Sequence, residues 1–159
     1  MLSLGQIRKR IQQGENIEKI VEELDWKEFE GLVMKILEEH NFLPHHNFRF
    51  KTNRFYEIDV LGVKENLVLA IDCKKWGRGR YKKFGLKDAV TKQKERIRQL
   101  KKMLKKNILT QEILNLPEKI KTIPLIVSWF EEDLVEHENV LIVPIWKLNK
   151  FLLNFSEYI

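Results

Sequence analysis

Apolar positions along the chain repeat with two different periods, and each period predicts a different kind of element. Near the N-terminus they recur every three or four residues, which predicts short amphipathic helices over residues 3–13 and 17–24. A firmer helix should start at Asp25, because Asp25 and Glu28 have the spacing of a capping box, and it should end near Asn41. The chain is therefore expected to open with three helices.

The middle of the chain changes to alternating apolar and polar positions, which predicts strands. Phe48 and Phe50 indicate one strand, and the runs over residues 55–63 and 66–76 indicate two more. These two runs meet around residues 64–66, so we expect them to form an antiparallel hairpin.

Helical and strand patterns follow one another in the remainder of the chain. After a basic loop at residues 77–80, the expected elements are a long basic helix at about 86–106, a helix at 108–115, strands at 123–130 and 139–145, and a short helix at 146–154. This order predicts an α/β fold with a mixed central β-sheet flanked by helices. Residues 1–24 should form a helical extension packed on a core domain of residues 25–159.

Composition narrows the class of protein. A chain of 159 residues that is 43% apolar and 33% charged suits one domain with one core. Cys73 is the single cysteine, which excludes an intramolecular disulfide and suits a reducing cytosol. No apolar run approaches the ~18 residues of a membrane span. We therefore expect a cytoplasmic protein with no membrane partner.

Charge is unevenly distributed along the chain. The formal net charge is +6, yet residues 74–106 carry 15 Lys and Arg against two acids. A block this basic suits a polyanion such as nucleic acid. The alternative is a lysine-rich, solvated helix of the kind found in heat-adapted proteins. Charge alone does not decide between the two.

Acidic residues of the predicted hairpin fall on particular faces of the strands. Period two places Glu57 and Asp59 on one face and Tyr56, Ile58 and Val60 on the other. This arrangement makes the face that carries Glu57 and Asp59 the candidate for chemistry.

The next strand carries a second charged pair, because Asp72 and Lys74 also share a face. A two-residue turn at Glu65-Asn66 would bring Asp59 directly opposite Asp72. Two carboxylates so close repel each other unless a cation lies between them, and oxygen ligands on two strands suit Mg²⁺. The alternative is a solvated ion-pair ladder on an open sheet face.

Two further polar residues fall on apolar stripes. Glu30 lies between Met34 and Leu37 around its helix, so its carboxylate is either buried or reaches out from the edge of the stripe. Gln93 lies on the apolar stripe of the basic helix, where it could border an active site or cap the end of a strand. His45-His46 is not expected to bind zinc, because adjacent histidines rarely converge on one ion.

These residues occur in motifs that resemble those of a known superfamily. Asp59, followed after 12 residues by Asp72-Cys73-Lys74, resembles the PD-(D/E)XK nuclease signature. Residues 29–33, 56–60 and 71–76 resemble the first-helix, Asp-strand and (Q/E/D)-C-K-(R/K)-(W/Y) motifs of Mrr-type restriction endonucleases. The likeness covers about residues 25–152. It departs from the pattern at Ile58, where the signature's name has Pro, and at Asp72, where many relatives carry Glu or Gln.

The resemblance implies a restriction-endonuclease-like core and a Mg²⁺-dependent DNA endonuclease in which Mn²⁺ can substitute. The implied catalytic residues are Glu30, Asp59, Asp72 and Lys74. Asp59, Asp72 and the Cys73 backbone carbonyl would hold the metal, with Glu30 acting through a water. Contacts to DNA phosphates are expected from the lysines of the basic helix and from Arg78, Arg80, Lys82 and Lys83, with Gln93 and Glu57 as accessory candidates.

Other functions share these motifs. Archaeal Holliday-junction resolvases have a similar arrangement of a helix Glu, an Asp and a (D/E)xK, so a junction- or RNA-directed nuclease is one alternative. A non-catalytic DNA-binding module and a structural protein with a charged ladder are two more. The sequence reveals no separate recognition domain, so specificity is expected from the N-terminal helices, the basic helix, a homodimer or a protein partner.

Overall fold

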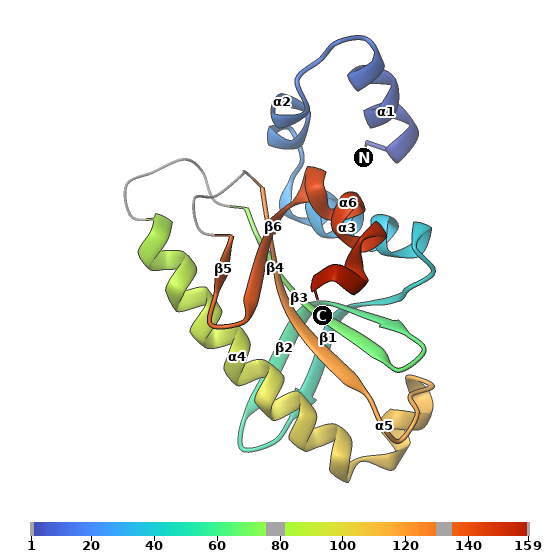
Figure 1. Cartoon of the computed structure of the whole chain (residues 1–159), viewed down its shortest axis with the longest axis vertical. Helices are drawn as coiled ribbons and strands as arrows, with labels where there is room; N and C mark the ends of the chain where they lie inside the picture. Colours follow the sequence, from blue (N-terminus) through green and yellow to red (C-terminus); the bar gives the residue numbers. More distant parts are fainter. Residues whose placement is uncertain (1, 76–81, 130–134, 159) are drawn as a thin grey trace.

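A computed structural model describes residues 2–75, 82–129 and 135–158, and its elements lie close to those predicted (Figure 1). The first half contains α1 (Leu4–Gln12), α2 (Ile17–Glu22), α3 (Trp26–Glu39), β1 (Leu43–Lys51), β2 (Phe55–Lys64) and β3 (Leu67–Lys74). The second half contains α4 (Lys82–Lys106), α5 (Ile108–Ile113), β4 (Lys121–Ser128), β5 (Glu136–His137), β6 (Val140–Pro144), α6 (Ile145–Leu153) and a 3-10 turn (Phe155–Tyr158).

The strands form one six-stranded mixed sheet in the order β1-β2-β3-β4-β6-β5. β1, β2 and β3 are antiparallel neighbours, β3, β4 and β6 run parallel, and β5 pairs antiparallel with β6. The predicted α/β class is confirmed, and the sheet is consistent with a restriction-endonuclease-like core. β5 was not predicted, because a strand of two residues is too short to show a period of two.

Helices cover both faces of the sheet (Figure 1). On one face, Phe29, Val33 and Leu37 of α3 share a core with residues of α1, α2, α6 and the central strands. On the other face, Ile97 and Leu100 of α4 pack against β1, β2 and β3. This confirms the apolar stripe predicted for the basic helix. Among the described residues, no helix is both long and apolar enough to cross a bilayer.

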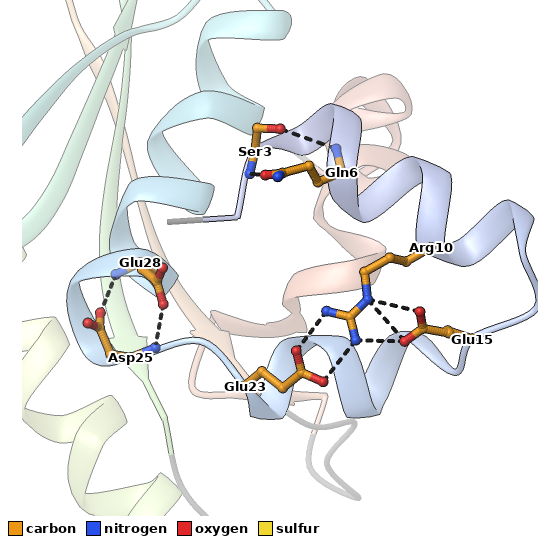
Figure 2. A network of polar contacts seen from close by, with 7 residues as sticks. All are labelled: Ser3, Gln6, Arg10, Glu15, Glu23, Asp25 and Glu28. Carbon is orange, nitrogen blue, oxygen red and sulfur yellow. Dashed lines mark hydrogen bonds and ion pairs between the residues drawn. The ribbon is translucent and has the colours of Figure 1, made fainter.

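The N-terminal helices are joined by Arg10. Its guanidinium pairs with Glu15 at 2.6 Å and with Glu23 at 2.7 Å, which links α1 to the end of α2 (Figure 2). These ion pairs raise the pKa of Arg10 and lower the pKa of Glu15 and Glu23. Ile20 of α2 is fully buried in the core shared with α3.

The start of α3 is set by the predicted capping box. Asp25 Oδ1 accepts from the Glu28 N–H at 2.8 Å, and Glu28 Oε2 accepts from the Asp25 N–H at 3.0 Å (Figure 2). Because the first turn of α3 is fixed in this way, the direction of Glu30, one turn later, is fixed with it.

The β2–β3 hairpin has the predicted register, with Lys64 opposite Leu67. The predicted alternation within β2 is wrong at one point. Tyr56 and Ile58 share a face, as expected, and that face packs on the α4 side, but Val60 packs on the α3 side. The side-chain alternation of β2 therefore reverses at Asp59.

The cause of this reversal lies in the paired backbone of β1. Asn47 has a left-handed φ of 49°, and the β1–β2 ladder skips Asn47 and Asp59 while keeping one register on both sides of them. A left-handed residue rotates the strand about its axis, and the neighbouring strand follows because the ladder holds it. Asp59 thus lies at a kink shared by two strands.

Candidate active site

The central sheet forks at the point where the acidic residues lie. β2 and β3 pair from Lys64–Leu67 only as far as Val60–Ile71. Beyond that pair, β2 stays with β1, whereas β3 stays with β4. Asp59 and Asp72 are the next residues on the two diverging strands. Asp59 Oδ2 bridges the fork by accepting from the Cys73 N–H at 2.8 Å.

Two neighbouring carboxylates act on Asp59 in the fork. Burial is the largest cause that raises the pKa of Asp59 to about 6, followed by the charge of Asp72 and a smaller contribution from Glu30. The Cys73 N–H and the Lys74 ammonium oppose this rise. Glu30 and Asp72 are themselves only 4% and 2% exposed. The fork therefore holds one half-buried and two buried carboxylates within electrostatic reach of one another.

Asp72 is held by two cations. Lys74 Nζ lies 2.9 Å from Asp72 Oδ2, and Arg96 Nη1 of α4 donates to Asp72 Oδ1 at 3.1 Å. The Lys74 ammonium also donates to Asp72 Oδ1 at 3.1 Å, so among the described residues Oδ2 has the ion pair with Lys74 but no hydrogen bond. Sequence reasoning counted Arg96 only within the basic block. Its spacing of three residues from Gln93, on the same helix face, was the signal that it points at the sheet.

Glu30 is buried and paired, which excludes the alternative that it reaches out to solvent. His46 Nε2 lies 2.5 Å from Glu30 Oε2. This partner was not predicted, because β1 begins at Leu43, earlier than the pattern of Phe48 and Phe50 indicated. The extra residues of β1 carry His46 alongside α3.

Gln93 is a structural anchor beside the site. Its Nε2 donates to the carbonyl of Ala70 at 2.7 Å and lies 3.5 Å from that of Leu125, on the adjacent strands β3 and β4. Its Oε1 accepts from Arg96 at 3.3 Å. Gln93 therefore fastens α4 to the sheet and orients the arginine that holds Asp72.

The remaining predicted residues lie in different places. Glu57 pairs with the exposed Arg49 at 2.5 Å, so the structure does not bring it to the fork carboxylates. The Cys73 thiol faces the apolar core, and burial raises its pKa well above the usual range. Lying outside the described residues are Arg78, Arg80 and the side chains of Lys82 and Lys83.

The fork suits a hard divalent cation held by two carboxylates. Within the described ranges, no three His, Cys, Asp or Glu side chains converge closely enough to enclose an ion. Mg²⁺ does not require such a cage, since it is usually bound by one or two carboxylates, waters and substrate phosphates. The raised pKa of Asp59 is a feature that a cation would relieve.

Three comparisons with known proteins each found a match. Residues 25–128 match the family described as "NERD: Nuclease-related domain", a PD-(D/E)XK-like nuclease family. An uncharacterized protein of Archaeoglobus fulgidus is 31% identical over 135 residues, which cover 84% of this chain and 94% of that protein. The crystal structure of protein VC1899 from Vibrio cholerae aligns with 99% of this chain and 36% of its own, at a TM-score of 0.35 and 14% identity. The chain thus spans about a third of that protein.

Proposed function

The chain belongs to the nuclease-related domain family, and we propose from that premise that it is a metal-dependent DNA endonuclease of the restriction-endonuclease type. One observation carries the proposal. The sheet opens between β2 and β3 where Asp59 and Asp72 lie side by side, with Lys74 paired to Asp72. Two carboxylates and an ammonium group beside them are the groups that phosphodiester hydrolysis needs.

Asp59 and Asp72 would hold Mg²⁺, or Mn²⁺ in its place, and the Cys73 carbonyl is a further candidate ligand. The bound ion would neutralise the charge of the phosphate and lower the pKa of a bound water. This use of the carboxylates agrees with their burial, because a buried carboxylate is unfavourable unless it is paired or coordinates a metal.

The chain's own cations and carboxylates would do the rest. Lys74 would position the attacking water and stabilise the charge that develops on the phosphate oxygens. Arg96 would keep Asp72 ionised and fixed in place, since it donates directly to that carboxylate. Glu30, held by His46, would orient a water at the edge of the fork. By resemblance to the superfamily, cleavage would leave a 5′-phosphate and a 3′-hydroxyl.

The proposed substrate is DNA, and one site of this kind cuts one strand. We therefore propose that cleavage of both strands uses a homodimer, with specificity supplied by the chain itself or by a protein partner. A junction-directed nuclease and a non-catalytic DNA-binding module are the competing functions, and the same assay separates them.

The test is cleavage of supercoiled plasmid at low salt, with Mg²⁺, Mn²⁺ or EDTA. We expect metal-dependent nicking or linearisation that Asp72→Asn and Lys74→Met both lose. Glu57→Gln is the matched control, because Glu57 lies on the same strand as Asp59 but pairs with Arg49, and it should cut at the wild-type rate.

Equal activity in the two site variants would point to a contaminating nuclease and sink the proposal. Salt-sensitive retardation of the plasmid without cleavage would favour the binding module. Cleavage of a four-way junction but not of plasmid would favour the structure-directed nuclease.

A further inference from the structure

Away from the fork, a pocket lies between the turn that joins β1 to β2 and the C-terminal end of α4. Its volume is about 670 Å³, and its lining includes no Asp or Glu. The polar side chains around it are Lys51, Thr52 and Asn53 of the hairpin and Lys102, Lys106 and Asn107 at the end of α4.

The three lysines of this pocket lack a carboxylate partner among the described residues, although Lys51 Nζ lies over the Phe55 ring, 5.1 Å from its centroid. Lys51, Lys102 and Lys106 are exposed, and none has an ion-pair partner among the described residues. By contrast, Lys92 and Lys94 of the same helix pair with acids at 2.7 and 2.8 Å. The helix dipole favours lysines at the end of α4, but it does not account for Lys51 on the hairpin opposite.

The side-chain amides of the two asparagines in the pocket use their oxygens as acceptors. Asn53 Oδ1 accepts from Thr52 Oγ1 at 3.1 Å and from Tyr56 Oη at 3.0 Å. Asn107 Oδ1 accepts from the Thr110 N–H at 3.0 Å. Each amide NH₂ group is therefore left without an acceptor among the described residues. Ammonium and amide donors without a carboxylate match the oxygens of a phosphate.

The long helix α4 connects this pocket to the fork. Arg96 contacts Asp72, and Lys102 and Lys106 follow six and ten residues later, a rise of about 9 and 15 Å at ~1.5 Å per residue. Phosphates of one DNA strand succeed each other every ~3.4 Å along a duplex. If the duplex axis ran parallel to α4, a strand with one phosphate at the fork would carry another, about three or four nucleotides away, near the pocket.

We propose that this lysine pocket binds a backbone phosphate of the nucleic-acid substrate, about three or four nucleotides from the phosphate at the fork. The inference rests on the proposed nuclease function, which supplies the nucleic acid. A membrane surface is the competing partner, because Ile108, Leu109 and Ile113 of α5 are exposed nearby. Nucleic acid is favoured for two reasons. The cationic site is concave, and the helix that carries two of its lysines, α4, also carries Arg96, which contacts Asp72.

The test measures binding without hydrolysis. The full chain is titrated into a fluorescently labelled DNA oligonucleotide in EDTA, over a series of salt concentrations, and anisotropy gives Kd. The pocket variant is Lys51→Gln with Lys102→Gln and Lys106→Gln. The matched control is Lys19→Gln with Lys27→Gln and Lys35→Gln, which removes the same charge from exposed positions on α2 and α3.

We expect the pocket variant to bind at least about tenfold more weakly, with a salt dependence shallower by about two to three phosphate contacts, while the control binds like wild type. An equal loss of DNA affinity in both triple variants would show that only net charge matters, and it would overturn the proposed phosphate site. Absence of wild-type binding at low salt would also overturn it. So would a pocket variant that loses binding to anionic vesicles but keeps its affinity for DNA.

The same variants separate failure of the pocket from failure of the proposed function. If wild type binds DNA through the pocket in EDTA but never cleaves it with Mg²⁺, the pocket stands and the nuclease proposal fails. If wild type cleaves and the pocket variant binds and cleaves equally well, the nuclease proposal stands and the pocket fails.

Discussion

The carboxyl group of Asp59 occupies a place that suits a cation better than it suits a free carboxylate. Its pKa is raised to about 6 from an ordinary value of 3.8, first by burial and then by Asp72. Among the described residues, the Cys73 N–H donates to one oxygen of this carboxylate, Oδ2, at 2.8 Å. Ionised Asp59 is therefore unfavourable in the metal-free protein, and in the proposed site a bound cation would offset that cost.

We expect Asp59→Asn to stabilise the metal-free protein above pH 6. Between pH 4 and 6 the folded state retains a proton that the unfolded state has released, so the free energy of unfolding of the wild type should fall as pH rises through this window. The upper limit of this loss is about 3 kcal/mol. The Asn side chain does not titrate and can still accept from Cys73. Urea unfolding in EDTA between pH 4 and 8 measures the difference.

In the proposed metal site, Asp59 is a ligand that Asn replaces poorly. We therefore expect Mn²⁺ or Mg²⁺ to raise the free energy of unfolding more for the wild type than for Asp59→Asn, so that the wild type becomes the more stable of the two. Equal stability of the two at pH 7.5 in EDTA would contradict the proposed repulsion between Asp59 and Asp72.

Arg96 should matter far more to stability than its neighbour Arg98. Arg96→Met leaves the buried Asp72 with Lys74 alone, and we expect a loss of about 2 kcal/mol, less than for a fully unpaired buried charge. Arg98→Met removes an exposed pair with Glu95 and should have little effect. Chemical denaturation of both variants provides the measurement, and similar losses would show that the Arg96 pair has no special weight.

At the scale of elements, the kink shared by β1 and β2 decides where Asp59 lies. In a regular strand, the side chains of Ile58 and Val60 would point into one common core, and the side chain of Asp59 would point to the opposite face. The structure instead places Ile58 and Val60 in different cores, with Asp59 at the turn between them. The left-handed Asn47 on β1 is the residue that permits this change.

We expect Asn47→Val to destabilise the protein by about 1–2 kcal/mol, because a β-branched residue is strained at a positive φ. It should also weaken stabilisation by Mn²⁺, since the kink positions Asp59. Asn47→Gly adopts the same φ without strain and is the control that should keep both properties. Thermal melts with and without Mn²⁺ test this. A Val variant as stable and as responsive to metal as wild type would show that the kink is dispensable.

At the scale of the whole molecule, the N-terminal helices share a core with the sheet. Ile20, Val21 and Leu24 are buried in the same cluster as Phe29 of α3 and the central strands. The Arg10 ion pairs that join α1 to α2 lie outside this cluster, at the surface (Figure 2). Burial of apolar side chains, rather than the ion pairs, therefore attaches these helices to the domain.

Ile20→Ala should lower the free energy of unfolding by about 2–5 kcal/mol, as for other fully buried side chains, and the protein should still unfold in one transition. Ile11→Ala on α1, where the side chain is 41% exposed, is the control and should change it by less than about 1 kcal/mol. Near-UV and far-UV circular dichroism during urea unfolding report the transition. Two separate transitions would instead make residues 1–24 an independent unit.

Local signals in the sequence predicted most of the helices and strands, and they predicted that Asp59 and Asp72 lie close together. The capping box of Asp25 and Glu28 and the two-residue turn after Lys64 depend on residues close in the chain, so the sequence alone located α3 and the β2–β3 register. The register in turn brought Asp59 to Asp72. The period of the apolar residues was enough for the α/β class, because each helix and strand must bury one face.

Only the tertiary structure decided which distant groups complete the site. His46 reaches Glu30 because β1 packs beside α3, and Arg96 reaches Asp72 because Gln93 fastens α4 to the sheet. The pocket of Lys51, Lys102 and Lys106 joins residues about 50 positions apart. Periodicity reports which face of an element is buried, but the partner across that face depends on packing between elements, which no local pattern encodes.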